Sequence, residues 1–195
     1  MMEKVKTTWL EITSPDEANF KEDFTGIMEI REVENDMYIN FMLFSGVGLP
    51  WRWYSRLNWT LPEWEDYFSR VRAKTFLGFA EGRIAGYYEI VFDDKNDAEI
   101  KFFGLLPSQM DKGLGGVLLS HAIKSSFDNG ASRIWLHTCT GDSEAALGNY
   151  LSRGFRIFKE EETYYEDVPG KDELVSMISR FFCNYYDHFR RKAGN

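Results

Sequence analysis

The sequence predicts an α/β fold of the α+β type, in which a mixed but mostly antiparallel central sheet is flanked by helices and an extra helix follows at the C-terminus. Apolar residues alternate with polar ones in several short segments and recur at helical spacing in others. Strand-like segments crowd together before residue 107, whereas strands and helices alternate after it. The length of 195 residues suits one domain, placed at residues 1–168, with an amphipathic extension at 169–195.

The first third of the chain is predicted to hold two strands and two helices. The strands are 7–13 and 26–33, the helices are 36–46 and 62–72, and an aromatic loop, GLPWRWYSRLNW, lies at 48–59.

A hairpin is predicted next. Two β-rich segments at 74–80 and 84–92 are separated by a turn at Glu81-Gly82. A second turn at 93–97 leads to a strand at 98–106, which Pro107 ends.

The rest of the chain predicts alternating elements. Apolar residues at helical spacing predict a helix over 113–129, which Asn129-Gly130 ends. This helix is predicted to join a parallel pair of strands. The other elements are a strand at 133–138, a helix at 143–153 with Ser143 as its N-cap and Gly154 after its end, and a strand at 155–167.

A last helix is predicted from Lys171 onward. One of its faces is apolar, and the residues on that face are Leu174, Ile178, Phe181, Tyr185 and Phe189. We interpret this stripe as an added layer on the core, and the alternative is a contact in a homodimer.

The composition excludes some partners. The formal charge of −8, from 31 acidic against 23 basic residues, argues against nucleic acid or an anionic membrane surface as the main partner. The chain starts without a long apolar run, and no stretch reaches the length that spans a bilayer. Cys139 and Cys183 do not make a disulfide framework, so we expect a cytoplasmic protein.

Three glycines stand together before the 113–129 helix, in SQMDKGLGG (108–116). Glycine at a helix entrance lets an anion, most often a phosphate, approach the backbone N–H groups at the positive end of the helix dipole. No Gly-Lys-Ser/Thr occurs, which excludes a Walker loop, and Leu118 stands where a dinucleotide fingerprint needs its third glycine. The alternative to an anion site is close packing of the helix on the sheet.

Two segments carry a resemblance to a known family. EIKFFGLLPSQMDKGLGG (99–116) and NYLSRGF (149–155) resemble the GNAT superfamily of acyl-CoA N-acyltransferases. Gly113 and Gly115 match the Q/R-x-x-G-x-G/A motif. Tyr150, Gly154 and Phe155 match Y-x-x-x-G-F. Met110 stands at the Gln/Arg position and Ser143 at the position of a frequent Asn, so the chain departs from the family there.

The resemblance covers residues 74 to 158, and it implies a GNAT-like sheet and an acyl-CoA donor. The pairing of WRWYSRLNW with WLHTCT is similar to an uncharacterised bacterial subgroup. The implied reaction is transfer of an acetyl group from acetyl-CoA to a primary amine of a small molecule or a peptide, by direct transfer in a ternary complex without a metal.

The resemblance also implies which residues hold the donor. Backbone groups from Phe103 to Leu106 are expected to face the pantetheine, with a bulge at Gly104 that frees them. The residues expected at the CoA are Phe103, Gly104, Leu105, Met110, Asp111, Lys112, Gly113, Leu114, Gly115 and Gly116.

Two residues are predicted to move protons. Glu99 is the expected base, since it falls where the histone acetyltransferase branch places its catalytic glutamate, with His137 and Glu89 as alternates. The competing interpretation is a carboxylate that faces water. Tyr150 is the expected acid for the departing thiolate, against the alternative of a packed tyrosine.

An acceptor pocket is predicted from the aromatic loop. Trp51, Trp53 and Tyr54, with Trp59, either wall this pocket or form a core cluster under the loop. His137 and Cys139 share one strand face, but two such residues make a poor metal site. Two other functions stay open: a non-catalytic acyl-CoA sensor and a nucleotide-binding regulatory domain.

Overall fold

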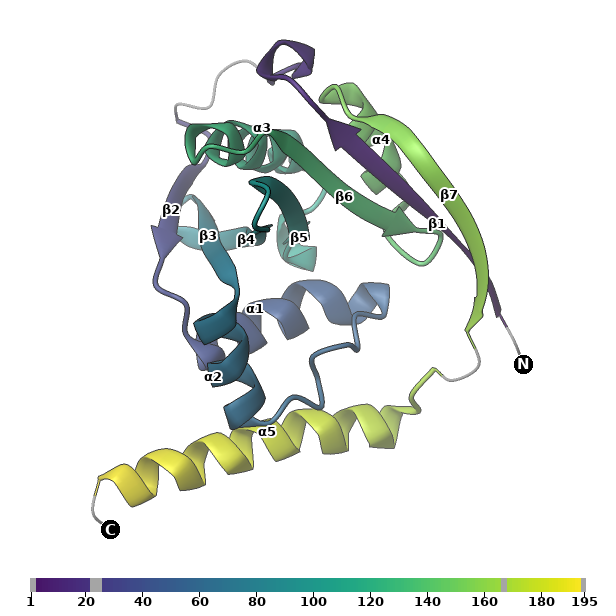
Figure 1. Cartoon of the computed structure of the whole chain (residues 1–195). Coiled ribbons are helices and arrows are strands. Elements are labelled where there is room, and N and C mark those ends of the chain that lie inside the picture. Colours follow the sequence, from purple (N-terminus) through teal and green to yellow (C-terminus); the bar gives the residue numbers. More distant parts are fainter. Residues whose placement is uncertain (1–2, 22–25, 166–167, 194–195) are drawn as a thin grey trace.

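A seven-stranded sheet runs through the molecule in the order β2-β3-β4-β5-β6-β1-β7 (Figure 1). The computed structural model describes residues 3–21, 26–165 and 168–193. The strands are β1 (Glu3–Ile12), β2 (Glu29–Val33), β3 (Arg72–Ala80), β4 (Arg83–Phe92), β5 (Asp97–Leu105), β6 (Arg133–Cys139) and β7 (Arg156–Tyr165). The α-helices are α1 (Met37–Gly48), α2 (Leu61–Arg70), α3 (Leu114–Asp128), α4 (Glu144–Ser152) and α5 (Lys171–Lys192), and the short 3-10 turns are η1 (Pro15–Glu17), η2 (Leu49–Trp51) and η3 (Pro107–Gln109).

The strand directions confirm the predicted fold class. Neighbouring strands are antiparallel except for β5 and β6, which are parallel and are joined by α3 as the sequence predicts. The N-terminal strand β1 lies between the two C-terminal strands. Thr7 therefore pairs with Cys139 of β6 on one side and with Glu161 of β7 on the other.

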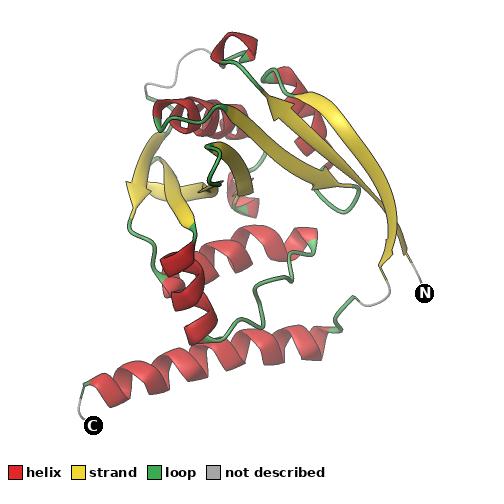
Figure 2. Ribbon diagram, in the orientation of Figure 1, coloured by secondary structure: helices red, strands yellow, loops and turns green. Residues whose placement is uncertain are grey.

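Helices cover both faces of the sheet (Figure 2). The ribbon shows α3 and α4 on one side and α1, α2 and α5 on the other. Along β4, Tyr88 and Ile90 belong to the core under α3, whereas Tyr87 belongs to the cluster under α1. This alternation follows from the two-residue period of a strand, and it buries both faces of β4.

Helix α5 packs against α1 through aromatic side chains. The Phe181 ring is stacked on the Phe41 ring with 3.7 Å between their centroids, and Tyr185 lies 4.9 Å from Tyr38. Part of the predicted stripe therefore forms an added layer on the chain's own core. Phe189, at the far end of the stripe, is 42% exposed, and a homodimer contact stays a prediction.

The turn and cap signals act where they were expected. Glu81 and Gly82 both have positive φ, as a tight hairpin turn requires, and so does Gly130 after α3. Ser143 caps α4 by accepting a hydrogen bond from the backbone N–H of Ala145 at 3.4 Å.

Two local expectations need correction. The strand predicted at 7–13 begins already at Glu3, because Lys4 and Lys6 form cross-strand ion pairs with acidic residues of β7 that no apolar alternation reveals.

The predicted bulge at Gly104 is wrong. The register of β5 shifts where Glu89 pairs with Phe102 and Ile90 with Ile100, so the extra residue is Lys101. The predicted last strand also included residues 166–167, which lie outside the described residues.

Gly154 generates a stability prediction. It has φ +98°, and an added Cβ would collide with the backbone oxygen of Glu17. We expect Gly154→Ala to lower the free energy of unfolding by about 2 kcal/mol or more, since the substitution combines backbone strain with a clash. Gly130→Ala is the matched control, because Gly130 has φ +88° but open space around it, and it should cost about 1 kcal/mol. Urea unfolding followed by tryptophan fluorescence measures both, and equal losses would contradict a role for the Glu17 contact.

Candidate active site

One cavity of about 1370 Å³ is lined by residues of several regions. They include the glycine-rich segment 108–116, called the glycine loop below, the ends of β5 and β6, the aromatic loop at 48–59, and one face each of β1 and β7. Pockets for one drug-sized ligand usually measure roughly 300–1,000 Å³. The cavity is therefore large enough for two ligands at once, one at the glycine loop and one at the aromatic loop.

Strands β5 and β6 separate inside this cavity. They pair only from Asp97 to Glu99, while β5 continues along β4 as far as Leu105. The extra residue Lys101 bends β5 at the point where the two strands part. Phe103, Gly104 and Leu105 line the cavity along the gap that this divergence opens. The N–H of Leu106 is not available to a ligand, because it donates to the backbone oxygen of Ala85 at 2.8 Å.

The glycine loop forms the other wall of the gap. Gly113 is the N-cap of α3 and has φ +72°, and Asp111 is also left-handed with φ +59°. The first N–H groups of an α-helix have no partner within the helix, so α3 presents donors at the loop. Of the residues predicted to hold the donor, all but one line the cavity: Phe103, Gly104, Leu105, Met110, Asp111, Gly113, Leu114, Gly115 and Gly116. The remaining one, Lys112, donates from Nζ to Gln109 Oε1 at 3.0 Å.

Three residues at the loop were not predicted. Lys21, Asn149 and Arg153 line the cavity beside Gly113, Gly115 and Gly116. Asn149 and Arg153 lie within NYLSRGF, so their helix face was a signal that sequence reasoning passed over. Lys21 lies far from the loop in sequence and left no local signal.

Tyr150 lines the cavity from α4 and is 7% exposed. Its ring makes edge contacts with Phe103 and Phe155. Burial raises the pKa of the Tyr150 phenol, and the negative charge of Asp142 raises it further. The hydroxyl therefore keeps its proton at neutral pH, as a proton donor must.

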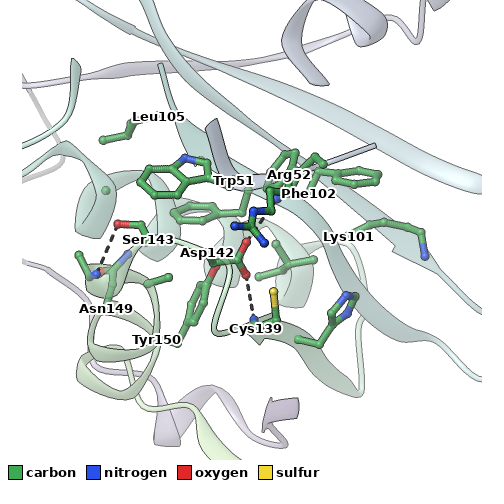
Figure 3. A pocket seen from close by; sticks show the side chains of 18 of the residues that line it. Trp51, Arg52, Lys101, Phe102, Leu105, Cys139, Asp142, Ser143, Asn149 and Tyr150 are labelled. Carbon is green, nitrogen blue, oxygen red and sulfur yellow. Dashed lines mark hydrogen bonds between the residues drawn. The ribbon is translucent and has the colours of Figure 1, made fainter. Parts of the chain in front are cut away.

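Asp142 lines the cavity and connects β6 to the aromatic loop (Figure 3). Its Oδ2 accepts hydrogen bonds from the Thr138 hydroxyl at 2.7 Å and from the Cys139 N–H at 2.9 Å, and its Oδ1 accepts a long one from Trp53 Nε1 at 3.4 Å. Burial raises the pKa of the Cys139 thiol, and Asp142 adds to the increase. A thiol in this state is a poor nucleophile at neutral pH.

Glu99 lies just behind the cavity wall. It is 9% exposed, and its Oε2 accepts a hydrogen bond from Lys101 Nζ at 2.9 Å. Its Oε1 lies 4.0 Å from Nδ1 of His137, which is half-exposed and lines the cavity. The structure thus places the two candidate bases, Glu99 and His137, next to each other.

The aromatic loop forms the far wall. Trp51, Trp53, Tyr54 and Trp59 all line the cavity, and Trp53 also packs against Phe44 and Phe102. Trp53, Tyr54 and Trp59 thus line the cavity and also pack against a core cluster, whereas Trp51 is on the cavity lining alone. An acceptor pocket at these residues stays a prediction.

Arg56 anchors the aromatic loop to β4 through Glu89. Its guanidinium donates two hydrogen bonds of 2.8 Å to Glu89, and both side chains are almost fully buried. Rings of Trp59, Trp64, Tyr67 and Phe102 surround the guanidinium at 4.3 to 5.2 Å from their centroids. Burial acts to lower the pKa of Arg56, but the Glu89 carboxylate outweighs burial and the net shift is upward.

Glu89 is fully occupied by these contacts. Besides Arg56, it accepts hydrogen bonds from the Tyr67 hydroxyl at 2.6 Å and from Asn40 Nδ2 at 3.3 Å. A carboxylate that accepts from four donors holds a loop in place, so Glu89 is poorly placed to take a proton from a ligand.

Within the described ranges, no three His, Cys, Asp or Glu side chains gather closely enough to hold a metal ion. In the same part of the chain, no helix is both long and apolar enough to cross a membrane.

The comparison with protein families identifies one match. The profile of the Acetyltransferase (GNAT) family matches residues 28–155. This region runs from just before β2 to the residue before β7, and it includes the glycine loop and Tyr150. Strand β1, Lys21 and helix α5 lie outside it.

Relatives cover part of the chain. An uncharacterised N-acetyltransferase of Mycobacterium bovis is 28% identical over 92 residues, which are 47% of this chain and 58% of the relative. Streptothricin acetyltransferase of Streptomyces lavendulae is 28% identical over 119 residues, which are 60% of each chain. The chain thus spans less than two thirds of the length of these relatives. Among solved structures, an acetyltransferase of Bacillus subtilis in complex with CoA has a TM-score of 0.52 at 22% identity, and the match covers 68% of this chain and 78% of that one.

The Arg56–Glu89 pair generates a stability prediction. We expect Glu89→Gln to lower the free energy of unfolding by about 3–5 kcal/mol, because it leaves a buried guanidinium without its countercharge. Asp128→Asn is the control, since it removes an exposed pair with Lys124 on α3 and should cost less than about 1 kcal/mol. Urea titration measures both, and a loss for Glu89→Gln as small as the control's would contradict the anchoring role.

Proposed function

The chain belongs to the GNAT family of acetyltransferases, and from this premise we propose that it transfers an acetyl group from acetyl-CoA to a primary amine by direct transfer within a ternary complex. Acyl transfer is the activity of the family, and the acetyl group, the amine and the ternary complex are the further content of the proposal. The observation that carries it is the single cavity that joins a glycine loop at a helix N-terminus to an aromatic pocket.

The donor end of the cavity suits a CoA thioester. Backbone groups of Phe103, Gly104 and Leu105 border the gap between β5 and β6, where the pantetheine amides would lie. The N-terminus of α3 and the glycine loop offer N–H groups to the pyrophosphate. Acetyl-CoA supplies an activated acetyl thioester.

Proton transfer is assigned to residues between the two ends. An alkylammonium has a pKa near 10, so the acceptor must lose a proton before its nitrogen attacks the thioester carbon. Glu99 is the proposed base. His137 lines the cavity and its Nδ1 lies 4.0 Å from Glu99 Oε1, which is beyond hydrogen-bond distance, so relay of the proton to that carboxylate through His137 requires the ring to move closer. Tyr150 is the proposed acid, which gives its proton to the CoA sulfur as the carbon–sulfur bond breaks.

The acceptor is proposed to be a small-molecule amine held against Trp51, Trp53 and Tyr54. Indole and phenol rings favour an acceptor with an apolar or aromatic part, and they also attract a cation to their faces. A relative that is named for acetylating streptothricin supports a small-molecule acceptor.

One observation favours a second candidate, a non-catalytic acyl-CoA-binding module. Glu99 is held by Lys101 and lies outside the cavity lining, as a residue without a catalytic role would. Such a module needs the glycine loop but neither Glu99 nor Tyr150 as a proton carrier.

Donor binding is tested by thermal unfolding with acetyl-CoA, and with ATP and NAD as controls. A ligand at about 100 times its dissociation constant adds roughly 2.7 kcal/mol, which raises the melting temperature by roughly 5–10 °C for a chain of this size. We expect this increase with acetyl-CoA and with neither control. No increase at saturating acetyl-CoA would contradict the proposal, and an increase with ATP or NAD alone would favour a nucleotide-binding domain.

Catalysis is tested by Tyr150→Phe and Glu99→Gln, assayed with a panel of primary amines. We expect Tyr150→Phe to lower kcat by about 100-fold or more without changing acetyl-CoA binding. Because burial raises the pKa of Tyr150 above its usual value, the wild-type rate should not fall as the pH rises from 7 to about 10. The defect of Glu99→Gln should shrink toward pH 10, where the amine loses its proton unaided.

Two outcomes would redirect the assignment. Unchanged turnover in both variants would remove these residues from the mechanism. Acetyl-CoA binding without turnover of any amine would favour the sensor.

A further inference from the structure

We propose that Lys21 and Arg153 form a cationic clamp for the phosphates of CoA, so that the protein selects CoA thioesters over thioesters of phosphate-free pantetheine. This inference rests on the proposed function and names the side chains that provide the donor's charge recognition. Both residues line the cavity at the glycine loop, and they reach it from different elements.

Lys21 crosses directly over the loop. Its Nζ donates to the backbone oxygen of Gly113 at 2.6 Å, and its backbone N–H donates to the Ser120 hydroxyl of α3 at 3.0 Å. A Cβ at Gly116 would lie 3.1 Å from Lys21 Cδ, and a Cβ at Gly113 would lie 3.0 Å from Nζ. Because Gly113 and Gly116 have no Cβ, they leave room for the Lys21 side chain to pass over the loop. An ammonium has three N–H groups, so two of them stay available for an anion.

Arg153 approaches the same loop from the end of α4. Its Cζ lies 3.8 Å from the position of a Cβ on Gly116. Its Nη1 makes a long 3.4 Å hydrogen bond to the backbone oxygen of Asn19, and its buried Nε has no hydrogen-bond partner among the described residues. A guanidinium has five N–H groups, so the Nη groups of Arg153 remain for a phosphate in the cavity, and no carboxylate among the described residues forms an ion pair with this side chain.

The two cations are held in one arrangement by Asn19. The backbone N–H of Asn19 donates to Arg153 O at 3.0 Å, and its side-chain amide donates to Ser152 O at 2.9 Å. These bonds attach the segment that carries Lys21 to the end of α4. The clamp thus joins the N-terminal region, α3 and α4 around the loop.

The glycine loop (108–116) has no net charge, because its one lysine and its one aspartate cancel. Its own lysine, Lys112, is directed to Gln109, and Asp111 brings a negative charge to the cavity wall. The whole chain carries a formal charge of −8, which repels an anionic donor at long range. The backbone N–H groups and the dipole of α3 attract an anion but carry no full charge, so cations outside the loop would add to this attraction. Lys21 lies outside residues 28–155, so this contact comes from a part of the chain that the family profile does not cover.

Isothermal titration calorimetry with CoA and with S-acetylpantetheine tests the clamp. The variants are Lys21→Met, which keeps the stem over Gly116 but removes the charge, and Arg153→Met. We expect each to weaken CoA binding by roughly tenfold or more, which is the effect of losing a hydrogen bond to a charged group. Binding of S-acetylpantetheine should stay within about twofold of wild type. Lys21→Arg should restore most of the CoA affinity, and this rescue separates charge from folding.

One variant and one further probe complete the design. Lys124→Met removes an exposed lysine farther along α3. It should bind CoA within about twofold of wild type. Titration with 3′-dephospho-CoA assigns the phosphate: a defect that vanishes with this probe places the clamp at the 3′-phosphate, and a defect that persists places it at the pyrophosphate.

The failure of each claim has its own result. Wild-type protein that does not bind CoA would overturn the proposed function. If wild type binds CoA and both Lys21→Met and Arg153→Met bind it as tightly as wild type, the clamp alone would be overturned. A defect of equal size for CoA and S-acetylpantetheine would also overturn it, because the loss would then be independent of the phosphates.

Discussion

The buried pair between Arg56 and Glu89 is the interaction on which the aromatic-loop side of the cavity depends. Arg56 belongs to the loop between α1 and α2, and Glu89 lies in the middle of β4. Burying two charges is unfavourable unless every polar atom finds a partner. Here the carboxylate accepts from Arg56, Tyr67 and Asn40, and aromatic rings surround the guanidinium. An irregular loop rich in indole rings is thereby fixed at one place on the sheet, and the wall of the cavity with it.

The two ends of the cavity are built on different physical principles. At the glycine loop the shape comes from the backbone: a left-handed residue at Gly113, a helix N-terminus, and a strand that leaves its neighbour after Glu99. At the aromatic loop the shape comes from aromatic side chains that the buried Arg56–Glu89 ion pair holds in place. Asp142 lies between the two ends, and its hydrogen bonds reach β6 on one side and Trp53 on the other.

What the sequence could predict follows from how local each feature is. Hydrophobic spacing, the Glu81-Gly82 turn and the Asn129-Gly130 stop act within a few residues, so nearly every element was found close to its place. The glycines and Tyr150 carried a family resemblance that the GNAT profile then supported. Lys21 and the Arg56–Glu89 pair were missed because each acts on a partner distant in the sequence, and the same holds for the hydrogen bond from Trp53 to Asp142. The bulge was assigned to Gly104 because glycine is the usual marker of a bulge, whereas a bulge at Lys101 leaves no mark in composition.

The position of β1 has a consequence for how the chain reaches its native state. This strand is made early, yet both of its neighbours, β6 and β7, come from the last third of the chain. During synthesis its apolar residues Leu10 and Ile12 have no partner strand until more than half of the protein has followed. Non-local pairing of this kind slows folding and leaves strand edges exposed to association with other chains. The half of the sheet that bears the inner wall of the cavity is therefore expected to be the last to close, and it is the half whose assembly would gain most from a chaperone.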